Sequence, residues 1–112
     1  MYIGEASKRS GLSIKAIRLY EEKGLIKVPE RIGRYRIYQE RDIELLVLIK
    51  EAKELGITLA ELKGVITYSG DTVDWGIIKS FLKDVRVQLT DQIESLKMKI
   101  ENLDKCYEQI DA

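Results

Sequence analysis

The chain has 112 residues, of which 45% are hydrophobic and 34% charged, and its formal net charge is zero. This balance is ordinary for a folded globular protein and excludes a disordered chain. The length predicts one domain with a modest core. No apolar run approaches the ~20 residues that span a bilayer, and residues 1–5 lack the basic and apolar regions of a signal peptide. Cys106 is the single cysteine, so no internal disulfide can form and we expect a cytoplasmic protein.

The charge is unevenly distributed along the chain. Residues 1–41 contain ten lysines and arginines against five acids, which leaves this part at +5 and the remainder at −5. A basic N-terminal part followed by an acidic C-terminal part favours a nucleic-acid partner at one end only. Chance asymmetry in a charged surface is the alternative.

Two short helices are expected at residues 3–10 and 14–23. Gly11 ends the first, because a residue without Cβ adopts the left-handed turn most easily. Ser13 is a good N-cap for the second helix, and Gly24 ends it. Two helices joined by a short turn that contains glycine are typical of a helix-turn-helix, although any helical hairpin gives the same pattern.

Residues 31–38, which we call the wing, alternate basic, aromatic and aliphatic side chains around Gly33. This pattern predicts a small β-hairpin. Arginine and tyrosine interleaved beside a helix-turn-helix favour DNA contact. An edge hairpin whose arginines are only solvated is the alternative.

A second pair of helices follows the wing. Residues 42–55 form an amphipathic pattern in which Ile43, Leu46 and Val47 share one face, and Gly56 breaks it. Thr58 and Glu61 have the spacing of a capping box, which predicts a further helix that ends near residues 69–70.

The last segment, about 76–110, contains no glycine or proline after residue 76 and predicts one long helix of ~50 Å. Leucines recur every seven residues and isoleucines fall between them, which is typical of a coiled-coil seam. The seam consists of Leu82, Leu89, Ile93, Leu96, Ile100, Leu103 and Tyr107, with Ile110 continuing the repeat. The rest of the chain offers no second long helix to cover it, so dimerisation is favoured over an intramolecular hairpin.

Catalysis is not indicated. The chain has no histidine and one cysteine, and it lacks a glycine-rich phosphate loop and clustered carboxylates. We therefore expect no catalytic residue, no metal site and no cofactor.

Several motifs together are specific. Residues 3–6 (IGEA), residues 16–25 (AIRLYEEKGL), Arg31 with residues 33–38 (GRYRIY), and residues 55–59 (LGITL) follow one another along the chain. In this order they resemble the helix-turn-helix, the wing and the following helix break of MerR-family regulators, and the resemblance covers the whole chain.

The resemblance implies a mainly α fold, with a winged helix-turn-helix DNA-binding domain at 1–70 and a linker and dimerisation helix at 71–112. It implies a homodimer whose long helices pack antiparallel as a coiled coil. Family members bind a palindromic element within an overlong promoter spacer and distort that DNA so that RNA polymerase engages it. Deforming DNA costs roughly 1–6 kcal/mol, which additional phosphate contacts offset.

The same resemblance implies the DNA contacts. Arg18 and Arg36 are expected to be exposed cations, while Ala16 and Ile17 pack inward. Most contacts would be made to phosphates and sugars, which fix the register of the protein on the duplex. The expected DNA-binding residues are Lys15, Arg18, Tyr20, Arg31, Arg34, Tyr35, Arg36 and Tyr38.

The motifs do not indicate which effector the protein senses, and family members differ in this respect. Metal sensors of the family place two cysteines around a loop after the long helix, where a thiolate pair suits soft metals. This sequence has only Cys106, six residues from its end, so we expect no metal sensing. A thiol-based stress sensor acting through Cys106 and an architectural DNA-binding or adaptor protein without effector response are the alternatives.

Overall fold

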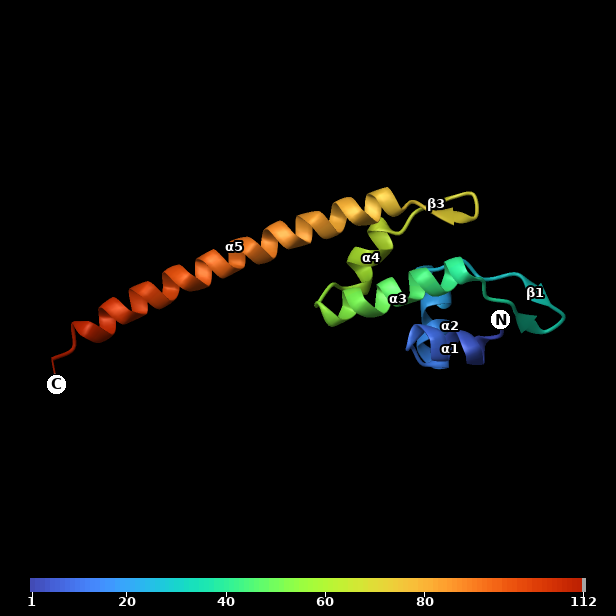
Figure 1. Cartoon of the computed structure of the whole chain (residues 1–112), viewed down its shortest axis with the longest axis horizontal. Coiled ribbons are helices and arrows are strands. Elements are labelled where there is room, and N and C mark those ends of the chain that lie inside the picture. The colour runs from blue at the N-terminus through green and yellow to red at the C-terminus, as the bar shows by residue number, and fades with distance from the viewer. Residues whose placement is uncertain (112) are drawn as a thin grey trace. The chain divides into compact units, whose positions relative to one another are not determined.

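The computed structural model describes residues 1–111 as two compact units, Met1–Asp74 and the residues from Trp75 onward. We call the first unit the head. Its elements are α1 (Ile3–Ser10), α2 (Ile14–Glu22), β1 (Arg31–Ile32), β2 (Tyr35–Arg36), α3 (Glu40–Glu54), α4 (Leu59–Val65), β3 (Tyr68–Ser69) and β4 (Thr72–Val73). The second unit is the helix α5 (Trp75–Glu108). The predicted mainly helical fold, with a winged helix-turn-helix and a long C-terminal helix, is confirmed (Figure 1).

The first two helices begin and end for the reasons that the sequence indicates. Gly11 has a left-handed φ of 76° and donates its N–H to the Ser7 carbonyl at 3.0 Å. The Ser13 hydroxyl accepts the N–H of Ala16 at 3.0 Å, which caps α2. Gly24, with φ of 75°, follows the last turn of α2. The predicted helix-turn-helix is therefore present.

Two antiparallel hairpins belong to the head. In the wing, Arg31 pairs with Arg36 and Ile32 with Tyr35. Gly33 lies first in the turn with φ of 62°, as a two-residue hairpin turn requires. The predicted wing hairpin is thus confirmed.

The second hairpin lies where the sequence predicts a helix that ends near residues 69–70, and that prediction is wrong. The structure ends α4 at Val65, and Ile66 is already extended. β3 then pairs with β4 around Gly70, whose φ is 66°. Consecutive β-branched residues favour extended backbone, and the hairpin closes with the Asp74 N–H donated to the Thr67 carbonyl at 2.8 Å.

The core of the head is built around α3. This helix begins at Glu40, two residues earlier than predicted, because the side chains and backbones of Gln39 and Asp42 form a capping box. Of the predicted face it buries Ile43 and Leu46, whereas Val47 is half-buried, and it also buries Leu45 and Ile49. The helix α1 packs against both α2 and α3. The buried hydrophobic residues of the head are Ala6, Ile17, Tyr20, Leu25, Ile26, Tyr38, Ile43, Leu45, Leu46, Ile49, Ala52, Ile57, Leu62 and Ile66.

The helix α5 differs in its burial. It has 34 residues, which corresponds to about 51 Å, and every residue from 86 to 111 is exposed. The predicted long helix is confirmed. Among residues 1–111, no helix combines the length and the apolarity that a membrane span needs.

Candidate nucleic-acid interface

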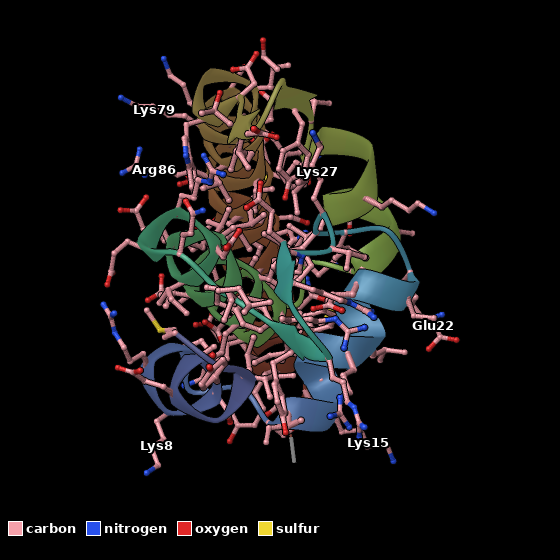
Figure 2. The ribbon with its side chains drawn as sticks, turned by 90° about the vertical axis from the view of Figure 1, so that its right-hand side faces the viewer. Lys8, Lys15, Glu22, Lys27, Lys79 and Arg86 are labelled. Atoms are coloured by element: carbon pink, nitrogen blue, oxygen red, sulfur yellow. The ribbon has the colours of Figure 1, made fainter. Side chains whose placement is uncertain are left out.

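The exposed side of α2 carries cations and apolar groups together. Ile17 and Tyr20 face the core, so the helical period leaves Lys15 and Arg18 exposed. Lys15 and Glu22 project from the helix away from the ribbon (Figure 2). Two apolar residues, Ile14 and Leu19, are also exposed on this side and were not among the predicted site residues. They line one surface hollow together with Ser13, Lys15, Ala16, Arg18 and Glu22.

The wing exposes Arg31, Arg34 and Tyr35, as predicted. Its strands are only two residues long, and the ring of Tyr35 lies against the ring of Tyr2, with 5.6 Å between centroids. Tyr2 therefore joins the wing surface, and the sequence analysis missed it because it precedes α1 in the chain.

Two of the predicted contact residues belong to the core instead. Tyr20 is 3% exposed and Tyr38 is 1% exposed, so neither side chain is accessible to DNA in this structure. Tyr20 lies on the same face of α2 as Ile17, where packing excludes water. We therefore remove Tyr20 and Tyr38 from the DNA-binding set.

Arg36 also differs from the expected exposed cation. Its side chain is 28% exposed, and its Nε atom lies 2.8 Å from the Oε2 atom of Glu21, whose side chain is 3% exposed. The two atoms are buried and are not aligned as a hydrogen bond, so the attraction is that of an ion pair. Glu21 would be an isolated buried charge without it, which is costly in a protein interior.

Tyr38 completes this buried cluster. Its hydroxyl donates to the Oε1 atom of Glu21 at 2.5 Å. Burial, followed by the hydrogen bond to the Glu21 carboxylate, raises the pKa of Tyr38 well above its ordinary value, so the hydroxyl stays a donor. The alternation of the wing contained a signal for this arrangement, since residues two apart share a face of a strand.

The structure brings part of the predicted set to one place. A surface hollow of about 80 Å³ is lined by Tyr2, Ile3, Arg18, Arg34, Tyr35 and Arg36. It joins the exposed side of α2 to the wing. Lys15 and Arg31 are exposed elsewhere on the same two elements.

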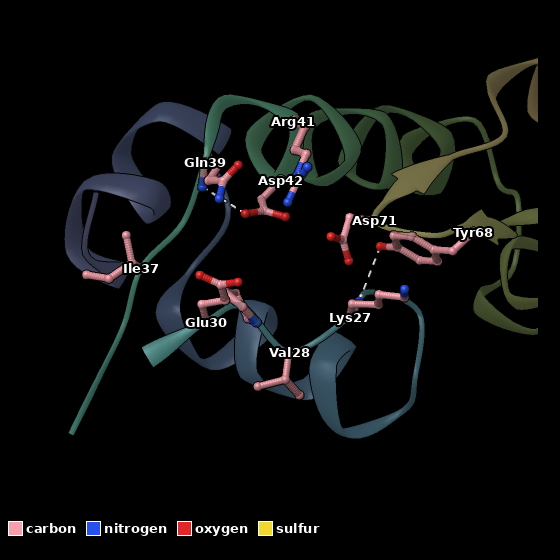
Figure 3. Close-up of a pocket in the computed structure, with 10 residues that line it drawn as sticks. Lys27, Val28, Glu30, Ile37, Gln39, Arg41, Asp42, Tyr68 and Asp71 are labelled. Atoms are coloured by element: carbon pink, nitrogen blue, oxygen red, sulfur yellow. Dashed lines mark hydrogen bonds between the residues drawn. The ribbon is translucent and has the colours of Figure 1, made fainter. Parts of the chain in front are cut away.

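A second cavity of the head lies between the wing, the start of α3 and the β3–β4 hairpin (Figure 3). Lys27 contacts the β3–β4 hairpin at this cavity. Its N–H donates to the Tyr68 hydroxyl at 3.2 Å, its ammonium donates to the Gly70 carbonyl, and it lies 4.9 Å from the Tyr68 ring centroid. Burial raises the pKa of Tyr68.

This second cavity has room for about two water molecules, since its volume is about 70 Å³. Glu30, Asp42 and Asp71 contribute carboxylates and Arg41 a cation to its lining. No three acidic or thiol side chains within residues 1–111 form a group that could hold a metal ion.

The predicted seam lies along α5. Leu82 is half-buried, and the other six residues are exposed, Leu96 by 58%. Cys106 is also exposed.

Comparisons with known proteins agree on one family. The family model for the "MerR HTH family regulatory protein" matches residues 1–69. A probable heavy metal-dependent transcriptional regulator of Haemophilus influenzae is 33% identical over 98% of this chain and 82% of its own length. The regulator CueR of Salmonella typhi is 29% identical over 98% of this chain and 76% of its own length. The mercuric resistance operon regulatory protein of Bacillus cereus is 33% identical over 97% of this chain and 87% of its own length.

A solved structure shares the fold. The transcription regulator PbrR691 from Ralstonia metallidurans CH34, determined in complex with lead(II), superposes with a TM-score of 0.55. The match is 23% identical in sequence and covers 94% of this chain and 86% of that one.

Proposed function

Because the chain belongs to the MerR family of helix-turn-helix regulatory proteins, and is therefore a transcriptional regulator rather than an enzyme, we propose that it binds promoter DNA in the cytoplasm as a homodimer. Residues 1–70 would form the DNA-binding part, and residues 71–112 the linker and dimerisation helix. The observation that carries the proposal is the grouping of exposed cations on α2 and the wing of one head.

The proposed DNA contacts follow from exposure. The helix α2 has the size and the exposed polar side that fit a major groove, and the adjacent wing would lie on the neighbouring backbone. Cations that reach phosphates give affinity and register. The proposed contact residues are Lys15, Arg18, Arg31, Arg34, Tyr35 and Arg36.

Two exposed apolar residues of α2 extend this proposal to sequence preference. Ile14 and Leu19 are 37% and 38% exposed beside Arg18. Thymine is the base that presents a methyl group in the major groove, and apolar side chains contact it favourably. We expect a thymine in the half-site where Ile14 or Leu19 meets the bases.

Dimerisation is proposed from the uncovered seam of α5. A stripe of leucine and isoleucine at heptad spacing is stable in water only when another helix covers it. The pairing residues would be Leu82, Leu89, Ile93, Leu96, Ile100, Leu103 and Tyr107.

The charges of α5 favour the antiparallel arrangement. Residues 77–91 carry three cations against two acids, whereas residues 92–111 carry three cations against five acids. Antiparallel pairing brings the basic half of one helix beside the acidic half of the other, while parallel pairing brings like halves together.

Regulation would act through the shape of the DNA. We propose that the dimer binds a palindrome in the promoter spacer and bends or untwists it so that RNA polymerase engages both promoter elements. The cost of such a deformation, roughly 1–6 kcal/mol, is offset by phosphate contacts that the bend permits.

The effector is proposed to differ from those of the metal regulators. Two relatives are named for heavy metal-dependent or mercuric resistance regulation in their own organisms. This chain supplies one thiol, exposed on α5, and no histidine. We therefore propose that Cys106 does not hold a sensed metal ion.

The experiment is a titration of the protein against labelled DNA from upstream of its own gene, with a shuffled fragment of equal length as control. We expect binding in the nanomolar range and at least 10³-fold preference for the native fragment. Equal affinity for both fragments would contradict sequence-specific binding. Transcription from the native fragment with purified RNA polymerase then separates a regulator, which changes the transcript level, from an architectural protein, which leaves it unchanged.

A further inference from the structure

We propose that Glu21, although acidic and buried, is a positioning residue for DNA binding, because it holds the Arg36 guanidinium at a hollow that receives one backbone phosphate. The hollow is the one lined by Tyr2, Ile3, Arg18, Arg34, Tyr35 and Arg36. This inference rests on the proposed DNA-binding function and names a phosphate subsite within it.

The hollow has the chemistry of a phosphate site. Its three arginines come from two elements, Arg18 from α2 and Arg34 and Arg36 from the wing. Arginine binds phosphate oxygens through two parallel N–H groups, which makes it stronger and more directional than lysine at such a site. No carboxylate lines the hollow, so its lining attracts an anion. A phosphate bound here would connect the recognition helix to the wing.

The orientation of Arg36 depends on Glu21. The Nε atom of Arg36 lies 2.8 Å from the Oε2 atom of the buried Glu21 carboxylate, in an ion pair that is not aligned as a hydrogen bond. A guanidinium is planar and its donors form a rigid fork, so holding the Nε atom beside Glu21 restricts where the two Nη groups can lie. With 28% of its side chain exposed, Arg36 lines the hollow as well as the core. Glu21 itself is buried and does not line the hollow.

The wing is held at the same carboxylate by a second residue. Tyr38 donates its hydroxyl to Glu21, and its backbone N–H donates to the Met1 carbonyl at 2.7 Å. The Tyr38 contact supports the position of the wing, whereas the Arg36 contact orients a ligand donor. The two roles are separable by substitution.

The inference makes a prediction with an unusual sign. Removing a negative charge from a DNA-binding surface ordinarily strengthens binding, because it lowers repulsion from phosphates. If Glu21 positions Arg36, Glu21→Gln weakens binding instead. Glutamine still offers Tyr38 an acceptor, but its amide cannot balance the Arg36 charge. Glu22→Gln is the matched control, since Glu22 is the adjacent acid on the same helix and is exposed.

The test measures affinity and salt dependence for the native promoter fragment with Glu21→Gln, Glu22→Gln, Arg36→Gln and the Glu21→Gln/Arg36→Gln double variant. We expect Glu21→Gln to lose about tenfold or more in affinity, as the loss of a charge-assisted contact in each head does. Its slope of log K against log salt should flatten toward that of Arg36→Gln, by about 0.9 per phosphate in each head. Glu22→Gln should bind as tightly as the parent or more tightly.

The double variant is decisive for the mechanism. It should bind no more weakly than Arg36→Gln, because residues that act through one contact are not additive. Fully additive losses, an unchanged slope, or tighter binding by Glu21→Gln would overturn the inference. A parent protein that fails to bind the fragment would instead contradict the proposed function itself.

Melting temperatures of all variants separate positioning from unfolding. Tyr38→Phe removes the hydrogen bond from the Tyr38 hydroxyl to Glu21 and leaves the Arg36 ion pair, so it should lower the melting temperature while the salt slope stays that of the parent. If Glu21→Gln does not fold, Arg36→Lys replaces it in the test. Lysine keeps the charge and the ion pair but lacks the fork, so a tenfold loss supports the inference and parental affinity overturns it.

Discussion

The head and the helix α5 use their hydrophobic residues in opposite ways. In the head, fourteen hydrophobic side chains are buried, from Ala6 to Ile66. In α5, Ile78 is the buried residue, and the leucines and isoleucines from position 89 onward are exposed. The head therefore buries its hydrophobic residues within one chain. The hydrophobic residues along α5 form only one side of a possible second core. In the proposed homodimer, a second copy supplies the other half, because it carries the same heptad pattern.

The largest expected effect is on dimerisation through the seam of α5. Leu96→Asp or Leu103→Asp places an unpaired charge in the dimer interface, which costs roughly 3–5 kcal/mol, so the variants should sediment as monomers and lose operator binding. Asn102→Asp introduces the same charge beside Leu103 but off the seam, and it should remain dimeric. Dimers of both leucine variants with full operator affinity would show that the seam is assigned wrongly.

A substitution that creates a cavity in the core of the head should lower the stability of the head and leave dimerisation unchanged. Leu46 is fully buried, so Leu46→Ala should lower the free energy of unfolding by about 2–5 kcal/mol. Urea unfolding followed by circular dichroism measures this change. Leu96→Ala is the matched substitution on α5, and it should weaken dimerisation with little change in the unfolding of the head. Equal destabilisation of the head by both changes would remove the distinction between the two regions.

The charge of the head should be visible in the salt dependence of binding. Arg18→Ala should flatten the slope of log K against log salt by roughly 0.9 per phosphate contact, and by about double that for a dimer with two heads. The fold should be unaffected, because Arg18 is exposed. Lys8 is an exposed cation of α1 outside the proposed set (Figure 2), so Lys8→Ala should leave the slope nearly unchanged. The assignment of Arg18 fails if both variants keep the parental slope.

A smaller effect is expected within the head, where Arg9 of α1 and Glu40 of α3 form an exposed bidentate ion pair with Nη2 and Oε2 2.6 Å apart. The hydrogen bond from Arg9 lowers the pKa of Glu40 below 4.5. A lowered pKa stabilises the fold above the pKa of the unfolded state and is lost as the pH falls through the folded value. Glu40→Gln should therefore melt slightly below the parent at pH 7, and the difference should close as the pH falls below 4.5. A gap that stays constant as the pH is lowered until the parent unfolds would contradict this cause.

No effect is expected at Cys106. A reporter strain carrying Cys106→Ser should respond like the parent to zinc, copper, silver, mercury and diamide, because one exposed thiol cannot enclose a soft metal ion. A selective sub-micromolar response that disappears in the variant would place the protein among thiol-based sensors.

Local signals predicted most of the fold. Glycines with positive φ and the caps at Ser13 and Thr58 determine where helices begin and end, and they act over three or four residues that are adjacent in the sequence. The heptads of α5 are likewise a local pattern. The strands of the β3–β4 hairpin are as short as those of the wing. This hairpin was missed because residues 66–73 lack the alternation of basic and aromatic side chains that indicated the wing.

The candidate site was predicted less well because its details depend on packing between distant residues. Glu21 and Glu22 are neighbours of the same type, yet only Glu21 is buried, against the wing residues Arg36 and Tyr38. Alternation places Arg36 and Tyr38 on one face of the wing, but it does not show that Arg36 meets the core while Arg34 stays exposed. Tyr20 and Tyr38 were assigned to DNA because tyrosine suits both a phosphate contact and a core with a polar partner.

The most direct test of the account is the stoichiometry of the complex on DNA, measured by sedimentation velocity with a labelled native promoter fragment. The account predicts two chains for each duplex, with no stable complex of one chain, and loss of that complex when Leu96→Asp separates the dimer. A complex of one chain per duplex at full affinity, or a stable dimer that leaves the fragment unbound, would contradict it.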